Sequence, residues 1–219
     1  DLLIIEDRYQ FKPPRPFAPG GEVAGVVEAV GPGVTQFKPG DAVFGNLTLF
    51  GYGAFAEYAS APERAWAHIP AGMTFESAAT LPGAAMRALQ GMRGSGRIEP
   101  GQRVLINGAS GNVGPFAVQI AKASGAHVTG VCSTGKMDLV GALGADDVID
   151  YTREDYTRNG QKYDFILDVK GNRSLFESRR ALKRQLEELL ETTREPGTRA
   201  EISRRIAETD ALLEREPYA

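Results

Sequence analysis

The sequence predicts an α/β protein made of three consecutive segments of different character. Residues 1–72 hold short apolar runs separated by Gly and Pro turns, which is typical of antiparallel β structure. Residues 73–178 alternate strand-like apolar runs with amphipathic helical patterns, which predicts parallel βαβ units. Residues 179–219 are rich in charge and carry two apolar stripes at helical spacing, which predicts an αα-hairpin. These three ranges are the expected domains.

Composition excludes several classes of protein. With 219 residues, of which 42% are hydrophobic and 24% charged, the chain has an ordinary globular composition. A formal net charge of −3 gives no general attraction to nucleic acid or to an anionic membrane, and no apolar run is long enough to span a bilayer. A single cysteine, Cys132, and two histidines make a zinc site unexpected. The first residues have no signal-peptide pattern, so we expect a cytoplasmic protein.

The N-terminal segment is expected to form a small barrel or sandwich. One strand is predicted at 23–30, where a near-continuous apolar run ends at a Gly-Pro-Gly turn. Further strands are predicted at 42–45, after another turn, and at 52–59, where apolar residues alternate with small or polar ones.

The middle segment predicts a regular alternation of helices and strands. Thr74 is the expected N-cap of a first helix, Pro82 interrupts that helix, and residues 84–92 continue as a helix. Buried strands are predicted at 103–107, 127–132, 147–150 and 163–168. The helices expected between them are 115–124 and 136–143, the second capped by Gly144. This alternation predicts a parallel sheet covered by helices.

The turn after the strand 103–107 carries the strongest functional signal. Glycines three apart let the backbone turn tightly and approach a pyrophosphate, while the N-terminus of the next helix offers N–H groups and a partial positive charge. A strand before the turn and a helix after it are the context that a dinucleotide-binding fingerprint requires. We therefore expect a nicotinamide dinucleotide at Gly108, Ala109, Ser110, Gly111, Asn112, Val113 and Gly114. The alternative is a purely structural turn, since tight strand-to-helix turns also use glycine.

The residues after the second strand of this unit favour NADPH over NADH. A site for NADH needs an Asp or Glu there, which accepts hydrogen bonds from the ribose hydroxyls. The chain has Ser133, Thr134 and Lys136 instead, and hydroxyls with a lysine suit the 2′-phosphate of NADPH. The alternative, in which Ser133 and Thr134 only cap the next helix, is compatible with either cofactor.

Several ordered motifs give the sequence a family resemblance. They are PGGEVAGVV at 19–27, VGPGV at 30–34, FKPGD at 37–41, GAFAEY at 53–58, GASGNVG at 108–114 and LGADDVIDY at 143–151. Together they resemble the medium-chain dehydrogenase/reductase superfamily, and its zinc-free quinone oxidoreductase or zeta-crystallin-like branch, over residues 1–182. The resemblance implies a partial GroES-like β domain followed by a partial Rossmann domain. Gly21 stands before Glu22 where zinc-using members have a histidine, which agrees with the scarcity of zinc ligands.

The resemblance also implies roles for residues around the cofactor. Positions that hold the adenosine 2′-phosphate in NADPH-using members are matched by Ser133, Lys136 and Tyr151. The loop that passes near the nicotinamide ribose is matched by Val169, Gly171 and Asn172.

On the substrate side, Tyr9 resembles an aromatic residue of the family's cleft, and a surface or core tyrosine is the equal alternative. Tyr9 or Tyr52 could donate a proton to the reduced oxygen of the acceptor. Arg87 occupies a position where a threonine often faces the nicotinamide. A bulky cation there would crowd the carboxamide, unless the alignment slips by one turn and Arg87 faces solvent.

Both ends of the chain depart from the family pattern. The chain begins inside the family's catalytic domain, and after residue 183 it runs into the charged tail instead of two further Rossmann strands. A half-sheet has an exposed edge that would pair with other strands unless it is covered. We expect residues 179–219 to cover such a surface or to mediate association, for example as a homodimer.

The sequence leaves three functions open. The first is a zinc-independent, NADPH-dependent oxidoreductase that transfers a hydride to a quinone, enone or other carbonyl acceptor. The second is a truncated or chimeric, catalytically inactive NADP-binding module. The third is an independent helical interaction domain at 183–219 that is carried by the reductase part.

Overall fold

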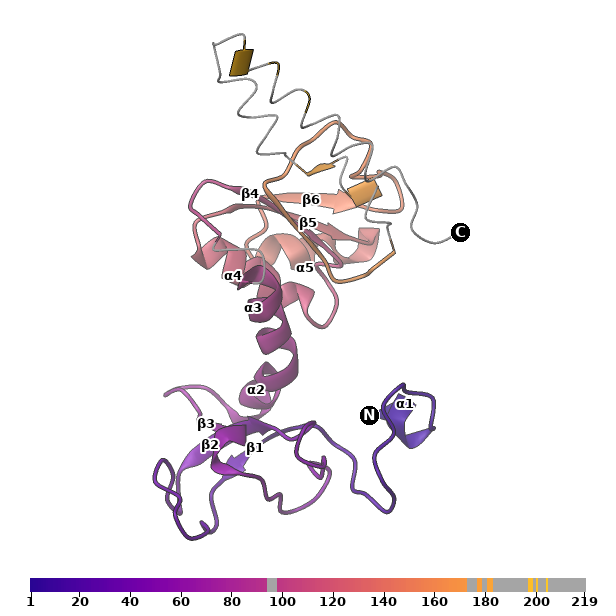
Figure 1. Ribbon diagram of the computed structural model, residues 1–219. Coiled ribbons are helices and arrows are strands. Elements are labelled where there is room, and N and C mark those ends of the chain that lie inside the picture. The colour runs from indigo at the N-terminus through magenta and orange to yellow at the C-terminus, as the bar shows by residue number, and fades with distance from the viewer. Residues whose placement is uncertain are drawn as a thin grey trace. The chain divides into compact units, whose positions relative to one another are not determined.

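The computed structural model describes residues 1–93, 98–172, 177–178, 181–182, 197–198, 200 and 204 (Figure 1). Contacts divide the chain into two compact units, unit 1 from Asp1 to Arg87 and unit 2 from Ala88 to Ala219. The helical hairpin predicted over 179–219 lies outside the described residues, apart from isolated positions.

Unit 1 is built on a three-stranded antiparallel sheet. Its strands β1 (Glu22–Val26), β2 (Ala42–Asn46) and β3 (Trp66–His68) lie in the order β1-β2-β3. The register places Ala24 opposite Phe44 and Phe44 opposite Ala67. The short elements α1 (Leu2–Ile5), η1 (Glu63–Ala65) and α2 (Phe75–Ala79) also belong to this unit. The predicted antiparallel character of this segment is therefore confirmed.

Three details of unit 1 differ from the prediction. Residues 52–59 form no strand, because Gly51, Tyr52 and Gly53 all have positive φ angles, of 100°, 65° and 102°, and an extended strand cannot continue through them. Strand β1 ends at Val26 rather than at residue 30. Strand β3 was not predicted, since its three residues show no clear alternation and their pairing partner β2 lies far away in the sequence.

The helical connection after the sheet follows the predicted pattern. The hydroxyl of Thr74 accepts a hydrogen bond from the Ser77 N–H, as expected for an N-cap. Pro82 lies in a π-helical turn, η2 (Leu81–Ala85), between α2 and α3 (Met86–Arg93). Because proline has no N–H to donate, the regular α-helical hydrogen bonding is interrupted there.

Unit 2 contains a four-stranded parallel sheet. Its strands β4 (Arg103–Asn107), β5 (His127–Cys132), β6 (Asp147–Asp150) and β7 (Phe165–Asp168) lie in the order β6-β5-β4-β7. Strands β4, β5 and β6 have the predicted bounds, whereas β7 begins at Phe165 because Tyr163 bridges to Leu182 instead. This order, with neighbours added on both sides of the first strand, is that of a Rossmann sheet.

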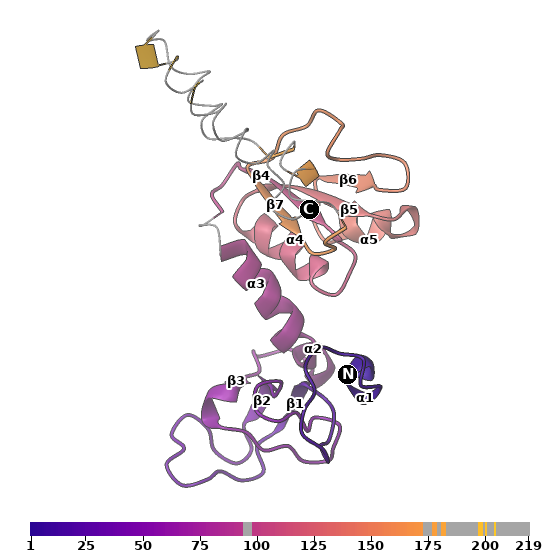
Figure 2. The same cartoon turned by 45° about the vertical axis from the view of Figure 1, so that its right-hand side comes forward.

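Helices pack against one face of this sheet. Figures 1 and 2 show α4 (Gly114–Ala123) and α5 (Met137–Ala142) on the same side of the strands. The short turn η3 (Thr134–Lys136) precedes α5, and Gly144, with a φ of 105°, follows it as the predicted cap. The βαβ prediction for this segment is confirmed.

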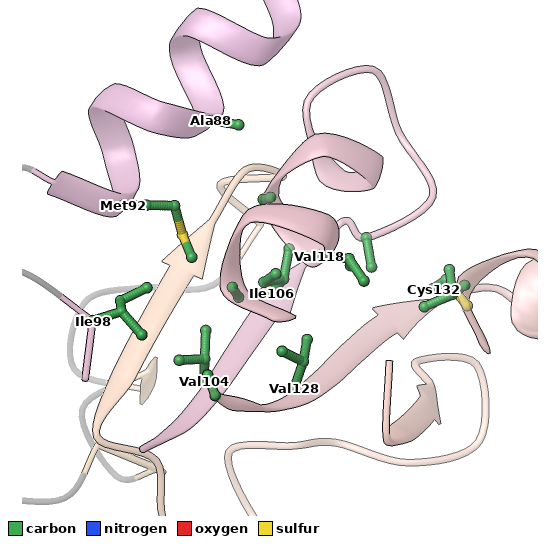
Figure 3. Packing of buried hydrophobic residues seen from close by; sticks show 13 residues of the cluster. Ala88, Met92, Ile98, Val104, Ile106, Val118, Val128 and Cys132 are labelled. Atoms are coloured by element: carbon green, nitrogen blue, oxygen red, sulfur yellow. The ribbon is translucent and has the colours of Figure 1, made fainter. Parts of the chain in front are cut away.

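The core of unit 2 follows the two-residue period of the strands. Val104 and Ile106 of β4 pack with Val118 of α4 and Met92 of α3 on the helical face (Figure 3). Leu105, between them, points to the opposite face, where it packs with Tyr163 and Ile149. All three β4 residues are fully buried, so the strand is enclosed on both faces.

A charged contact fastens α4 to the loop before β6. The Lys122 ammonium lies 2.7 Å from Oδ1 and 2.8 Å from Oδ2 of Asp146, and Asp146 Oδ2 also accepts a hydrogen bond from the Val128 N–H. The hydrogen bond from Lys122 is the main cause that lowers the pKa of Asp146 below its ordinary value. The contact therefore links α4, β5 and β6 through one carboxylate.

We predict that Asp146→Asn destabilises the protein at neutral pH but not in strong acid. The pKa of Asp146 is lower in the folded protein than in the unfolded chain, so its stabilisation is complete above the unfolded-state pKa of about 3.9 and is lost as the pH falls through the folded-state pKa. Urea unfolding at several pH values measures the difference. The exposed carboxylate Asp138 provides the control Asp138→Asn, and an equal loss at all pH values would contradict the electrostatic explanation.

Candidate functional site

The predicted dinucleotide loop connects β4 to α4 and is anchored to the neighbouring strand. The N–H groups of Gly108 and Ala109 both donate to the Val131 carbonyl of β5, at 3.1 and 3.0 Å. The loop then folds on itself, because the Gly111 N–H donates to the Gly108 carbonyl at 3.0 Å. With Gly108 at a φ of 88°, these bonds hold the backbone close to the first turn of α4.

The glycines of this loop have different physical roles. A Cβ atom at Gly114 would overlap the Gly108 carbonyl oxygen and lie 2.6 Å from the Ala109 Cα, so close packing of the helix start on the loop requires glycine. A Cβ atom at Gly111 would meet only the Gly108 carbonyl oxygen, at 3.3 Å. The space beside Gly111 is therefore open to a ligand, next to the N-terminal N–H groups of a ten-residue helix. This arrangement fits a pyrophosphate.

The residues predicted to hold the adenosine 2′-phosphate lie together at the carboxyl ends of β5 and β6. Ser133 is half-buried after β5, Lys136 is exposed in η3, and the Tyr151 side chain is 53% exposed after β6. The two strand ends are joined by a hydrogen bond from the Tyr151 N–H to the Cys132 carbonyl, at 3.1 Å. Thr134, the fourth predicted residue, directs its hydroxyl to the Asp150 carboxylate.

Asp150 is a buried carboxylate of this region that the sequence did not single out. One of its oxygens accepts hydrogen bonds from the N–H and hydroxyl of Thr152, at 2.9 and 2.8 Å, and Arg153 lies 3.6 Å from the other. The hydrogen bond from Thr134 is the main cause that lowers the pKa of Asp150, so its charge is held within the protein. The adjacent Cys132 thiol is buried, and burial, followed by the Asp150 charge, raises its pKa.

The residues predicted near the nicotinamide ribose follow β7. The Val169 N–H donates to the Asn107 carbonyl at 3.0 Å, and the Gly171 N–H donates to Asp168 Oδ1 at 2.8 Å. Asn172 accepts a hydrogen bond from the Asn107 side chain at 2.9 Å. The ends of β4 and β7 mark the point where the strand order reverses, which is where ligands bind in sheets of this class. Sequence reasoning missed Asn107 and Asp168, although polar residues ending two buried strands were a visible signal.

Unit 1 contains a cavity of about 600 Å³. Tyr9 and Tyr52, the two predicted proton donors, both line it, as does Arg87. Tyr52 is 7% exposed and packs against the rings of Phe11 and Phe17, with centroids 6.3 and 6.1 Å away, whereas Tyr9 is 40% exposed. The structure thus brings the two tyrosines to one cavity, which the exposed Arg87 also lines.

Polar residues shape the wall of this cavity near Gly21. Glu22 accepts a hydrogen bond from the Gly83 N–H at 2.5 Å, which ties β1 to the π-helical turn. A Cβ atom at Gly21 would lie 2.7 Å from the Thr48 hydroxyl, so a larger residue there requires Thr48 to move. Among the described residues, no group of three or more His, Cys, Asp or Glu side chains could hold a metal ion. The helices of the described part are all too short or too polar to cross a membrane.

Two known protein families match successive parts of the chain. Residues 1–71 match the alcohol dehydrogenase GroES-like domain family, and residues 112–185 match the zinc-binding dehydrogenase family. The human mitochondrial NAD(P)H oxidoreductase RTN4IP1 is 41% identical over 163 residues, which cover 71% of this chain and 41% of that protein. The chloroplastic quinone oxidoreductase QR1 of Triphysaria versicolor is 38% identical over 161 residues, 69% of this chain and 49% of QR1.

Solved structures show a likeness to the same kind of oxidoreductase. The Escherichia coli quinone oxidoreductase, determined in complex with NADPH, superposes with a TM-score of 0.72 and 29% identity, covering 84% of this chain and 59% of that one. The chain spans less than half the length of the two curated relatives named above. The two family matches, together with the quinone oxidoreductase relatives and structures, show that over about 180 residues the chain belongs to the medium-chain dehydrogenase/reductase superfamily, in its quinone oxidoreductase-like branch.

Proposed function

We propose that the protein binds NADPH and reduces a quinone, enone or other small carbonyl acceptor without zinc. The observation that carries this proposal is the loop at 108–114, in which Gly114 is required by packing while the space beside Gly111 is open at the start of α4. Turn geometry favours glycine at Gly108, which has a positive φ, and packing requires it at Gly114, whereas neither reason applies at Gly111. The open position at Gly111 is what a bound pyrophosphate needs.

The preference for NADPH rests on the ends of β5 and β6. Lys136 is exposed and Ser133 half-buried there, and the Asp150 carboxylate that ends β6 is already bound to Thr134 and Thr152 and lies near Arg153. Asp150 is therefore not free to accept hydrogen bonds from the ribose hydroxyls of NADH, whereas a 2′-phosphate would meet the Lys136 ammonium.

The chemistry of reduction would be supplied by the dihydronicotinamide, which is a hydride donor. The role of this chain is to bind the phosphates through backbone N–H groups and Lys136. It also holds the loop 169–172 in place. Tyr9 and Tyr52, in the cavity of unit 1, are the candidate donors of a hydrogen bond or proton to the oxygen of the acceptor. The quinone oxidoreductases among the relatives support a conjugated carbonyl as the acceptor.

Zinc independence is supported by the residue types of the chain. A catalytic zinc ion takes three protein ligands, usually His, Cys or a carboxylate. The chain offers one cysteine and two histidines, and His127 is paired with Asp147 at 2.8 Å. Gly21 precedes Glu22 in a place where Thr48 leaves little room for an imidazole.

The function is tested by following NADPH oxidation with a simple quinone, together with NADPH binding by calorimetry. Turnover above background in the presence of a metal chelator is the expected result. NADPH binding without turnover would favour the alternative of a cofactor-binding module, because this chain covers only part of its relatives. Absence of NADPH binding would contradict the proposal.

Substitutions at the two glycines should separate packing from ligand binding. Gly114→Ala is expected to destabilise the fold by roughly 3 kcal/mol, because its methyl group has no space against the loop backbone. Gly111→Ala is expected to change stability by less than about 0.5 kcal/mol. It should nevertheless weaken NADPH binding about tenfold, since the methyl group occupies the space for the pyrophosphate.

Thermal unfolding and calorimetric titration of both variants provide the two measurements. Unchanged NADPH affinity in Gly111→Ala would mean that the loop is only a structural turn.

Lys136→Ala should lower the affinity for NADPH while the affinity for NADH stays the same. Loss of a charge-assisted contact to the 2′-phosphate corresponds to about a tenfold change in the dissociation constant. The exposed Lys38 of unit 1 offers a control, Lys38→Ala, that removes the same charge elsewhere. Titration of all three proteins with both dinucleotides measures the effect, and an equal loss for NADPH and NADH would contradict the assignment of Lys136.

A further inference from the structure

We propose that Asn107 is a positioning residue, whose buried side-chain amide fixes the loop 169–172 for the nicotinamide end of the cofactor. The inference rests on the proposed function and adds to it a residue that no sequence motif indicated. Asn107 is the last residue of β4, is 4% exposed and immediately precedes the phosphate loop.

The Asn107 side chain joins two elements through one nitrogen. Its Nδ2 donates to Asp168 Oδ1 and to Asn172 Oδ1, both at 2.9 Å. An ionised carboxylate only accepts hydrogen bonds, so the NH₂ group of Asn107 must be the side that faces Asp168. Both protons of this amide are therefore used to hold residues at the end of β7 and in the loop beyond it.

Asp168 completes the clamp from the other strand. Besides the Asn107 amide, its Oδ1 accepts the backbone N–H groups of Gly171 at 2.8 Å and Lys170 at 3.1 Å. The three hydrogen bonds that this one carboxylate oxygen accepts are charge-assisted, and each of them is therefore strong. Residues 169–172 are exposed to solvent, and these bonds, with the one from the Val169 N–H to the Asn107 carbonyl, hold their backbone to the ends of β4 and β7.

The clamp also sets the loop against the phosphate-binding turn. A Cβ atom added at Gly108 would lie 3.5 Å from the Lys170 N and Cβ atoms and 3.6 Å from the Val169 Cβ atom, so the two loops are about one methyl group apart. Asn107↔Asp168 is the last pair of the β4–β7 register, at the point where the strand order reverses. The Asn107 amide thus holds the loop 169–172 beside the phosphate-binding turn at 108–114.

The test uses the whole chain and two ligands, NADPH and adenosine 2′,5′-bisphosphate, which carries only the adenosine half. Asn107→Asp replaces the donor by an acceptor and places it opposite the Asp168 carboxylate, so both donated bonds are lost. NADPH affinity is expected to fall about tenfold while the affinity for the bisphosphate stays within about twofold. Amide exchange of Lys170 and Gly171 in the unliganded chain should accelerate.

The exchanged pair Asn107→Asp/Asp168→Asn serves as the rescue variant. It restores a hydrogen bond between positions 107 and 168 with donor and acceptor reversed, so NADPH affinity should recover over that of Asn107→Asp. Asn107→Ala removes both donated bonds without placing a second carboxylate opposite Asp168, and it gives the same measurement if Asn107→Asp does not fold.

The outcomes distinguish the positioning role of Asn107 from the proposed function. An equal loss of affinity for both ligands, or no recovery in the exchanged pair, would show that Asn107 acts only on the stability of the fold and would overturn the positioning role. Unchanged NADPH affinity in Asn107→Asp would overturn it as well. If the unsubstituted chain bound neither ligand, the proposed function itself would be wrong, and the positioning role with it.

Discussion

Burial of β4 on both of its faces is the constraint on which unit 2 depends. Val104 and Ile106 pack toward the helices and Leu105 toward the opposite cluster, and all three are fully buried. A shift of one residue would exchange the two faces and place the polar ends of the strand in the core. The pairing of β4 with β5 on one edge and β7 on the other is therefore held in a single register.

The same register assembles the candidate site. It places Asn107 opposite Asp168 and Cys132 opposite Asp150, so the polar ends of neighbouring strands meet at one edge of the sheet. The carboxylates there mainly organise the protein, Asp168 by holding a loop and Asp150 by holding Thr134 and Thr152. Backbone N–H groups and Lys136 are left for a ligand, which suits a phosphate-rich molecule.

Much of unit 2 could be predicted because its signals are local. Buried parallel strands are short apolar runs, so β4, β5 and β6 were predicted with their observed bounds, and the glycine turn lies directly between a strand and a helix. The strand predicted at 52–59 was wrong, because the alternation of residue types does not show that the three consecutive residues 51–53 adopt positive φ angles. The Asn107–Asp168 clamp was missed because its partners are 61 residues apart, so only the sheet pairing brings them together.

The burial of Cys132 has a chemical consequence. Quinones and enones are electrophiles that add readily to thiolates, and the thiolate, not the thiol, is the nucleophilic form of cysteine. Burial and the neighbouring Asp150 charge raise the pKa of this thiol, so at neutral pH it stays protonated. The one cysteine of the chain is therefore protected from alkylation by the kind of molecule that the protein is proposed to reduce.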